Sequence, residues 1–576
     1  MMKKFEKFVH AILDKKSKKT LVIVLTALAF FGTVMMLPTQ LVLAKMLPGK
    51  SDNTYSVYVD TPSGSSIEQT KKVSSCVIDI LEQEREVMNL ELFEGQGIPL
   101  DYAGLVKGAG MKRTENVAEI SVNLTDKHER TEPSFLMVQR LRPIVKQRCE
   151  PLVPNTTIKF VEQPAGPPTL ASIVVEVHGE DMRKVRHIST KVADILAHTN
   201  GLVDVDVMAD EIYSKYELIP DKEKIARSGL SVEQVNNIIY LAFEGMVIAH
   251  KNSKNSPDQI PIFLVLDQET KRLNSQQEEA LQSKLSSLNL MNMRGMMVPL
   301  SEVVTIRKVP SNPMIMHKDL SRMVNVIAET DMVSQLYPLL DAREQMIEAF
   351  SKEYNVTKEP GMSTYMFDLH LEDPKTGEKY LLRWDGEMKV SLDTFRDLGG
   401  AFIAALILIF LLLVVYYKSF ALSGIILLGS FLSLIGVILG HWAANFFTSE
   451  TFFLTATSLI GFIALMGISS RNSLLLIDFA KSLMVEHGIP KRSAISIAAA
   501  TRAKPILLTA VAIILGSALL ASDPVFGGLG VALISGTVAA VFVSLLFVPI
   551  LMDNSKAMDF EPAKKKSDEP KVSITR

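Results

Sequence analysis

The chain has 576 residues, a formal net charge of −2 and 48% hydrophobic residues, while 22% of its residues are charged. This hydrophobic fraction is too high for a soluble protein of ordinary composition. The two fractions are compatible if one part of the chain lies in lipid and another part lies in water. The composition therefore indicates a membrane protein with a large soluble region.

Apolar segments that are long enough to cross a bilayer lie at both ends of the chain. A membrane-spanning helix needs about 20 mainly apolar residues. One such segment covers residues 21–37, and a region of soluble character follows it up to residue 397. The other candidates share an almost unbroken apolar character and cover residues 401–417, 421–442, 452–480, 505–521 and 525–552. The sequence predicts six membrane spans.

Basic residues near the span ends predict the orientation, because cytoplasmic loops are enriched in Lys and Arg. They gather in the first 19 residues, in the hairpin at 481–504 and in the tail: Lys3, Lys4, Lys7, Lys15, Lys16, Lys18, Lys19, Lys491, Arg492, Lys564, Lys565 and Lys566. Six crossings place all three regions in the cytoplasm, so residues 45–397 are expected outside it. A cleaved signal peptide ending at Ala44 is the alternative for the first span, but the basic lead is long for such a peptide.

The two cysteines, Cys76 and Cys149, both fall in the exported region, where a disulfide is permitted. Two cysteines do not make a disulfide framework. The sequence alone leaves open whether Cys76 and Cys149 are bonded to each other.

The exported region is expected to contain two βαβ-type units. Residues 54–159 read as strand, helix, strand, strand, helix, strand, which is the ferredoxin-like pattern. The strands at 55–59 and 118–124 alternate apolar and polar residues, as half-buried strands do. A second unit begins after the segment at residues 163–168, which is rich in Pro. Its second half begins only at residue 323.

An insertion at residues 209–311 separates the halves of the second unit. Within it, Ser231 and Gln234 form a capping box that opens a helix at residues 232–243.

The sequence thus predicts an α-helical polytopic membrane protein with an α+β exported region. The expected layout is a cytoplasmic lead at 1–19, a first span at 20–44, one subdomain at 45–162, a second at 163–208 and 312–385, the inserted subdomain at 209–311, five spans at 386–552 and a cytoplasmic tail at 553–576.

The sequence carries no sign of an enzyme. It lacks a nucleophile motif, a His/Glu pair at zinc-ligand spacing and a phosphate-binding loop. Met291, Met293, Met296 and Met297 could indicate a soft-metal site, but two neighbouring methionine pairs in a loop are more typical of packing. We expect no metal, no cofactor and no nucleic-acid partner.

Arg471 is the most informative residue of the membrane region, because about 18 mainly apolar residues precede it. A charged side chain at the bilayer centre costs at least about 2.5 kcal/mol on insertion scales, so it should face protein and have a partner. Asp478 lies two helical turns away, about 10 Å along the axis, which is too far for a direct ion pair. An arginine that reaches the membrane surface is the alternative, but Lys481 already anchors that end of the span.

The next span contributes Arg502 and Thr509, which are seven residues apart and share one helical face. Arg502 taken alone also fits an ordinary cytoplasmic basic residue. None of the six expected spans has a carboxylate or histidine near its middle, because Asp478 is near the cytoplasmic end and His441 is expected at the outer surface. The negative partner of Arg471 is therefore expected on another polypeptide.

The layout and several motifs resemble the C-terminal half of resistance-nodulation-division (RND) efflux permeases, and are most like the hydrophobe and drug exporters of the acriflavine-resistance type. The matching segments are Met-Leu-Pro at 46–48, Gly-Pro-Pro at 166–168, Val-Pro-Leu-Ser-Glu-Val at 298–303, Gly-Ile-Ser-Ser-Arg-Asn at 467–472, Asp-Phe-Ala-Lys at 478–481 and Lys-Pro-Ile-Leu-Leu-Thr at 504–509. The likeness covers nearly the whole chain, with the two tails excepted.

In that family, two such halves are fused into a subunit with twelve spans, which works as a trimer with a periplasmic adaptor and an outer-membrane channel. Aspartates in the fourth span take up protons, and basic and hydroxyl residues in the tenth and eleventh spans interact with these aspartates. The resemblance implies that the proton relay contains Arg471, Asn472, Asp478, Arg502 and Thr509. It also implies that the loop after Phe93 is a gating loop of the substrate pocket, with Phe93, Tyr102 and Leu105 as its site residues.

The first six spans and their aspartates have no counterpart in this sequence. The resemblance therefore implies half of an inner-membrane antiporter with its large loop in the periplasm, which pairs with a separately encoded N-terminal half and uses the proton gradient to export hydrophobic or amphiphilic compounds. The Met start and basic lead are compatible with separate encoding. The alternatives are an inert truncated gene product and a six-span protein-translocation accessory, and the accessory would need its own intramembrane carboxylate.

Overall fold

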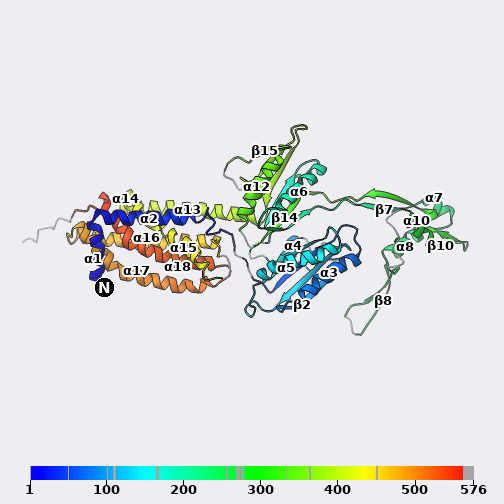
Figure 1. The fold of residues 1–576 in the computed structure, drawn as a ribbon, viewed down its shortest axis with the longest axis horizontal. Helices are drawn as coiled ribbons and strands as arrows, with labels where there is room; N and C mark the ends of the chain where they lie inside the picture. Colours follow the sequence, from blue (N-terminus) through cyan, green and yellow to red (C-terminus); the bar gives the residue numbers. More distant parts are fainter. Residues whose placement is uncertain are drawn as a thin grey trace, which may run out of the picture. The chain divides into compact units, whose positions relative to one another are not determined.

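The computed structural model describes residues 2–47, 49, 51–99, 102–107, 112–163, 166, 168–254, 257–267, 273, 278–331, 334–361, 365–448 and 452–561. The chain divides into two compact units, one formed by Met1–Ala209 with Ile315–Arg576 and the other by Asp210–Met314. The first unit contains a bundle of apolar helices and two α/β subdomains (Figure 1). The protein therefore combines a helical membrane part with an α+β region, as the sequence predicts.

Six helical segments in the described part of the chain are long and apolar enough to cross a membrane, which confirms the predicted number. They pack into one bundle (Figure 1). They are α2 (Lys16–Met35), α13 (Glu387–Tyr417), α14 (Phe420–Phe431) with α15 (Leu434–Ala444), α16 (Ala456–Val485), α17 (Lys491–Ala521), and α18 (Gly527–Phe542), which continues through a π-helical turn at Val543–Phe547 into α19 (Val548–Asn554).

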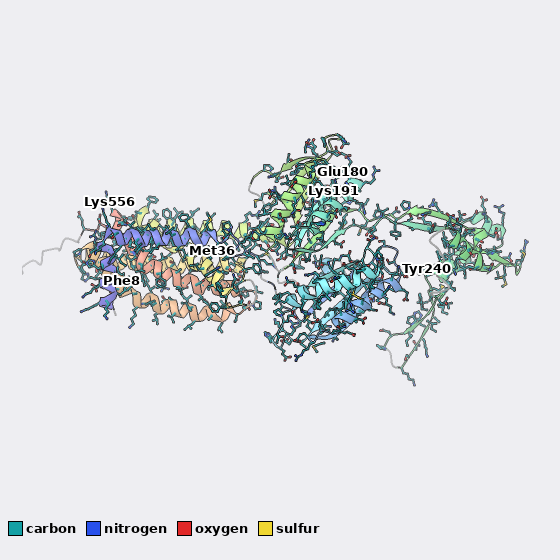
Figure 2. The ribbon with its side chains drawn as sticks, viewed as in Figure 1. Phe8, Met36, Glu180, Lys191, Tyr240 and Lys556 are labelled. Atoms are coloured by element: carbon teal, nitrogen blue, oxygen red, sulfur yellow. A yellow bond between two sulfur atoms is a disulfide. The ribbon has the colours of Figure 1, made fainter. Side chains whose placement is uncertain are left out.

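The basic lead forms an amphipathic helix, α1 (Met2–Asp14), whose apolar face packs against the bundle. Lys19 of α2 forms an ion pair with Asp553 near the end of the last span. Phe8 of α1 lies at the opposite end of the bundle from Met36, which follows α2 (Figure 2). The start of the first span and the end of the sixth therefore meet at the same end of the bundle, as an even number of crossings requires.

The first α/β subdomain is an antiparallel sheet with the strand order β2-β3-β1-β4, which matches the expected ferredoxin-like unit. Side chains of alternate residues point to opposite faces of a strand, so Tyr55, Val57 and Val59 enter the core beneath the two helices while Tyr58 faces the other side. The elements are β1 (Thr54–Asp60), α3 (Ile67–Leu81), β2 (Val87–Glu94), β3 (Val117–Leu124), α5 (Ser134–Cys149) and β4 (Thr157–Glu162).

A disulfide joins Cys76 of α3 to Cys149 at the end of α5, a bond that the sequence left open. The two cysteines are 73 residues apart in the sequence, yet their Cα atoms are 5.8 Å apart. The reason is that α3 and α5 pack side by side against the same face of the sheet.

The second subdomain is a seven-stranded sheet with the order β13-β14-β5-β17-β16-β15, in which β6 also pairs with β14. The helices α6 (Met182–Ala197) and α12 (Leu336–Phe350) pack on its core. Its strands are β5 (Ile173–His178), β6 (Leu202–Met208), β13 (Met316–Lys318), β14 (Ser321–Thr330), β15 (Asn355–Lys358), β16 (Leu369–Glu372) and β17 (Lys379–Asp385). Strands β15–β17 extend the sheet beyond the βαβ unit read from the sequence.

The inserted unit, Asp210–Met314, has its own small apolar core. Ser231 and Gln234 form the predicted capping box at the start of a helix. The described elements are β7 (Ser214–Pro220), α7 (Lys222–Arg227), α8 (Val232–Phe243), β8 (Met246–Lys251), β9 (Ile260–Leu264), α10 (Glu278–Ser287), β10 (Asn289–Met291), β11 (Met297–Pro299), α11 (Leu300–Val303) and β12 (Val304–Pro310).

A seam of ion pairs joins α5 and β4 of the first subdomain to β6 of the second. The Nε atom of Arg142 lies 3.1 Å from one carboxylate oxygen of Asp204, and Nζ of Lys146 lies 2.6 Å from the other. Lys159 pairs with Asp206 at 2.5 Å. The first subdomain supplies the cations and the second supplies the anions, so the charges on the two edges are complementary. Removal of one partner of a buried pair is costly because the other charge is left uncompensated.

Glu162, the last residue of β4, lies among the charges of this seam. Removal from water raises the pKa of Glu162 to about 7, an effect that Arg142 opposes and Glu329 reinforces. The net charge of the seam therefore changes near neutral pH.

The disulfide should stabilise the first subdomain by restricting its unfolded chain. For a loop of this length, we expect the double substitution Cys76→Ala and Cys149→Ala to lower the free energy of unfolding by about 4 kcal/mol in the chain-entropy estimate. Hydrogen exchange of the β1–β4 peptides in the full chain measures this effect. Unchanged protection of these peptides would contradict the expectation, and peptides of α6 and α12 provide the internal control.

The substitution Glu162→Gln should change stability in a pH-dependent way. The folded pKa of Glu162 is raised above its unfolded value, so its contribution is fully present below about pH 4.5 and is lost as the pH rises through about 7. We expect the variant to be more stable than the parent by about 3 kcal/mol at pH 8.5, and nearly equal to it below pH 4.5. Thermal unfolding at both pH values tests this, with the exposed Glu82→Gln as control. A difference that is independent of pH would refute the assignment.

Candidate functional site

Arg471 lies at the middle of the 30-residue helix α16. Its side chain is exposed on the surface of the bundle. No hydrogen bond or ion pair joins it to any other residue that the structure describes. A guanidinium at this depth has no water to solvate it in a membrane, so it requires a partner that comes from outside the described residues.

The exposed face around Arg471 consists of small and aliphatic side chains. Ile460, Ala464, Gly467 and Leu475 are exposed on α16 at intervals of three or four residues from Arg471, and therefore lie on the same helical face. A Cβ atom added to Gly467 would have no neighbouring atom of another described residue within 4 Å. Small residues on membrane helices allow another helix to approach closely. This face can therefore receive a second membrane helix next to Arg471.

Asp478 is hydrogen-bonded to tyrosines of α13. The hydroxyl of Tyr417 donates a hydrogen bond to one carboxylate oxygen of Asp478 at 2.8 Å, and the hydroxyl of Tyr416 lies 3.4 Å from the other. Asp478 therefore fastens α13 to α16, and the described structure contains no direct pair between it and Arg471, as the helical spacing predicts.

Arg502 and Thr509 lie on α17, which packs against α16. The guanidinium of Arg502 lies 5.0 Å from the ring centroid of Phe479, a cation–π contact. Its Nε atom is buried and has no hydrogen-bond partner in the described part of the chain. The hydroxyl of Thr509 donates within its own helix, to the carbonyl oxygens of Pro505 and Ile506.

The five residues expected to form the proton relay are therefore distributed over two adjacent helices. Arg471, the half-buried Asn472 and Asp478 are on α16, while Arg502 and Thr509 are on α17. The hydrogen bonds among described residues do not join them into one network, so their shared role stays a prediction.

His441 lies near the end of α15, and its side chain is fully buried between α15 and α16. Its Nδ1 atom lies 2.8 Å from the carbonyl oxygen of Val437, and its Nε2 atom lies 2.8 Å from the hydroxyl of Ser458. Since the carbonyl can only accept, Nδ1 carries the hydrogen and Nε2 accepts from Ser458 when the ring is neutral. The position near Trp442 did not reveal this burial, because it depends on how α15 meets α16.

The first α/β subdomain offers a second candidate site, on the face of its sheet opposite the two helices. Phe93, Tyr58, Ile98 and Val161 form an apolar cluster on this face. The segment after β2 therefore folds back over the sheet. The base of this segment is fixed by a backbone hydrogen bond, in which the N–H of Gly95 donates to the carbonyl oxygen of Val117 at 2.8 Å.

A buried carboxylate, Glu119 of β3, holds this segment in place. The N–H of Ile98 donates to its Oε2 at 2.8 Å, and Nζ of Lys112 lies 3.5 Å from its Oε1. Burial raises the pKa of Glu119, an effect that these two contacts oppose. Sequence reasoning missed Glu119, because it occupies a polar position of a strand in which apolar and polar residues alternate.

The three residues expected at the gating loop have different surroundings. Phe93 belongs to the apolar cluster, and Leu105 of the short helix α4 (Tyr102–Lys107) is 63% exposed. The side chain of Tyr102 lies outside the described residues. Lys107 connects α4 to the second subdomain through an ion pair with Glu329 at 2.9 Å. Among the described residues, no group of three or more His, Cys, Asp or Glu side chains is placed to hold a metal ion.

The sequence profile of the AcrB/AcrD/AcrF family matches residues 1–365 and 370–553. The multidrug export protein AcrF of Escherichia coli (strain K12) is 22% identical over 516 residues, which is 88% of this chain and 45% of that protein. The cobalt-zinc-cadmium resistance protein CzcA of Cupriavidus metallidurans is 23% identical over 386 residues, which is 66% of this chain and 33% of that protein.

The fold is similar to the crystal structure of a heavy metal efflux pump, with a TM-score of 0.68 and 18% sequence identity. The match covers 95% of this chain and 51% of the pump. The chain thus spans about half the length of that pump, and less than half the length of the two curated relatives. Its motifs, its six spans and its two α/β subdomains agree with the profile match, and the chain belongs to the AcrB/AcrD/AcrF family of RND efflux permeases.

Proposed function

We propose that this chain is one half of a proton-driven efflux pump of the bacterial inner membrane, and that a separate polypeptide supplies the other six spans. The observation that carries this proposal is Arg471, a central cation on an exposed face with no partner among the described residues. Carboxylates on a membrane helix of the second polypeptide would neutralise it. The small residues on the same face of α16 leave room for that helix.

The proposed mechanism uses the charge of those carboxylates as a switch. When they are ionised, they attract Arg471, and when they are protonated, the attraction is lost and the two groups of spans move apart. Such a change shifts the balance between conformations because the two states bind protons with different affinity. Rigid-body rocking of one group of helices against another is the usual form of this motion in secondary transporters.

The junction between β17 and α13 can transmit this motion to the exported region. Only Gly386 separates the strand from the membrane helix, and its φ of 86° is accessible to glycine. A Cβ at this position would lie 2.6 Å from the carbonyl oxygen of Ala171. The N–H of Glu387 donates to the same oxygen at 3.1 Å. Movement of α13 therefore acts directly on the second sheet.

Hydrophobic or amphiphilic compounds are the cargo that we propose, with the large exported region in the periplasm. Relatives are named for multidrug export and for metal resistance, so family membership leaves both cargo classes open. The apolar cluster of Phe93, Tyr58, Ile98 and Val161, beneath the segment that follows β2, favours an apolar compound. A trimeric assembly, a periplasmic adaptor and an outer-membrane channel complete the proposed pump.

Purification of the tagged chain from its native membranes in mild detergent, followed by mass spectrometry, tests the proposal first. We expect a stoichiometric partner with six spans and carboxylates in its fourth span. Recovery of this chain alone would contradict a pump made of two polypeptides, and purification from cells with the untagged chain identifies background proteins.

Substitution of Arg471 tests its role within the assembled pump. We expect Arg471→Ala to lower efflux of a lipophilic cation such as ethidium at least about tenfold, because the partner carboxylates lose their counter-ion in the membrane. Arg471→Lys retains the positive charge and should retain part of the activity. Lys481→Ala, on an exposed lysine of the same helix, is the matched control. Full efflux by Arg471→Ala, at equal amounts of protein, would disprove the assignment.

A further inference from the structure

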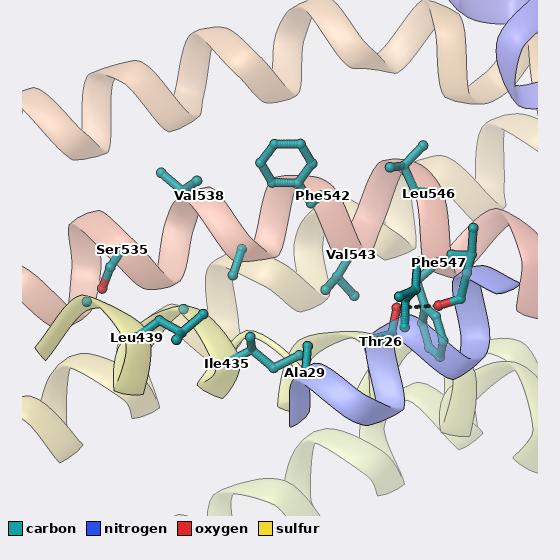
Figure 3. A pocket seen from close by; sticks show the side chains of 15 residues that line it. Thr26, Ala29, Ile435, Leu439, Ser535, Val538, Phe542, Val543, Leu546 and Phe547 are labelled. Atoms are coloured by element: carbon teal, nitrogen blue, oxygen red, sulfur yellow. Dashed lines mark hydrogen bonds between the residues drawn. The ribbon is translucent and has the colours of Figure 1, made fainter. Parts of the chain in front are cut away.

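The membrane bundle contains an apolar groove between α2, α15 and α18, with a volume of about 580 Å³ (Figure 3). Thr26 and Ala29 of α2 form one wall. Gly440 of α15 and Ser535 of α18 lie opposite, and Phe547 lies at one end. The groove is separate from Arg471 and from the relay proposed above.

The groove exists because α15 and α18 pack together more closely than α2 packs against either. A Cβ on Gly436 would lie 2.3 Å from the carbonyl oxygen of Ser535, and one on Gly440 would lie 2.0 Å from the hydroxyl of Ser535. These glycines therefore allow the two helices to touch. Along the whole of α2, only Lys19 and Thr33 are buried among the described residues. The small side chains of α2 do not fill the space that remains.

The walls of the groove are apolar, and the hydroxyl groups in them are already hydrogen-bonded. The hydroxyl of Thr26 donates to the carbonyl oxygen of Val22 at 2.8 Å (Figure 3). The hydroxyl of Ser535 donates to the carbonyl oxygen of Val531 at 2.6 Å. Both hydroxyls in the lining are thus satisfied within their own helices. A ligand in this groove gains dispersion contacts and needs no hydrogen bond.

The dimensions of the groove suit an extended hydrocarbon chain. From Ser535 to Phe547 the groove follows α18 and its π-helical turn for about 18 Å. The groove has a volume of about 580 Å³, and an extended hydrocarbon chain can lie along this length. The π-helical turn at Val543–Phe547 contributes Val543 and Phe547 to the lining, and such turns occur frequently at functional sites.

The positively charged Lys18 lies at the end of the groove next to the start of α2. Lys18 precedes Val22 by four residues and Ala29 by eleven, so it lies on the face of α2 that lines the groove. Its side chain is exposed and has no ion pair among the described residues, whereas the neighbouring Lys19 is paired with Asp553. An exposed lysine at the membrane surface attracts anionic lipid headgroups.

We propose that the groove binds one acyl chain of an anionic glycerophospholipid, whose phosphate group lies beside Lys18. The lipid comes from the leaflet that borders the basic end of α2. Its chain fills the space between α2 and the α15–α18 pair, and thereby holds the first span against the rest of the bundle.

Photoaffinity labelling of the full chain in membrane vesicles tests the proposal. The probe is phosphatidylglycerol with a diazirine on one acyl chain, and the labelled peptides are identified by mass spectrometry. We expect adducts to concentrate on groove residues of α2, α15 and α18. Ala29→Phe and, independently, Ala539→Leu fill the groove and should lower this labelling about tenfold. Leu508→Phe, on an exposed position of α17, is the matched control and should leave it unchanged.

The headgroup is tested with a second pair of variants. Lys18→Gln should lower groove labelling by phosphatidylglycerol about fivefold and remove its preference over a phosphatidylcholine probe. Lys4→Gln, on an exposed lysine of α1, should change neither the groove labelling nor the preference for phosphatidylglycerol. Even labelling of all exposed helix faces, or labelling that both filling variants leave unchanged, would overturn the proposal. So would a cross-link to another protein from a photoreactive amino acid at position 29.

Discussion

The cost of holding a guanidinium at the middle of an apolar helix governs how the membrane part of this protein can work. Arg471 is flanked on α16 by aliphatic and small residues, and water cannot reach it in a bilayer. The described residues around it donate and accept among themselves: the tyrosines of α13 hold Asp478, and Phe479 stacks with Arg502. A carboxylate from outside the described structure is therefore the simplest way to satisfy Arg471. The proton coupling that we propose follows from this requirement.

The α/β region uses charge in a different way, through ion pairs between its own two subdomains. The seam between the two sheets pairs cations of the first subdomain with anions of the second, and Lys107 adds a further link from α4 to Glu329. The pKa of Glu162 is raised to about 7 by burial among these charges. The seam is thus sensitive to protonation near neutral pH. The direct junction of β17 with α13 connects the two regions mechanically.

Sequence periodicity and composition determined most of the fold. Six apolar segments of sufficient length can only form helices in lipid, because every backbone polar group there must be satisfied internally. Alternation in the strands of the first subdomain was enough for its ferredoxin-like pattern, and Ser231 with Gln234 marked a helix start correctly. Arg471 was recognisable because a charge inside an apolar segment violates the pattern around it. These features depend on neighbours along the chain, which the sequence lists directly.

Contacts between distant segments were decided only by the tertiary structure. The disulfide depends on two helices that meet 73 residues apart, and the burial of His441 depends on how α15 packs against α16. Glu119 resembles a solvent-facing strand residue until the segment carrying Ile98 folds over it. The groove beside α2 arises because Gly436 and Gly440 let α15 approach α18. In each case the side chain's environment is created by a partner that the local pattern does not specify, since burial and pairing are properties of packed surfaces and not of sequence spacing.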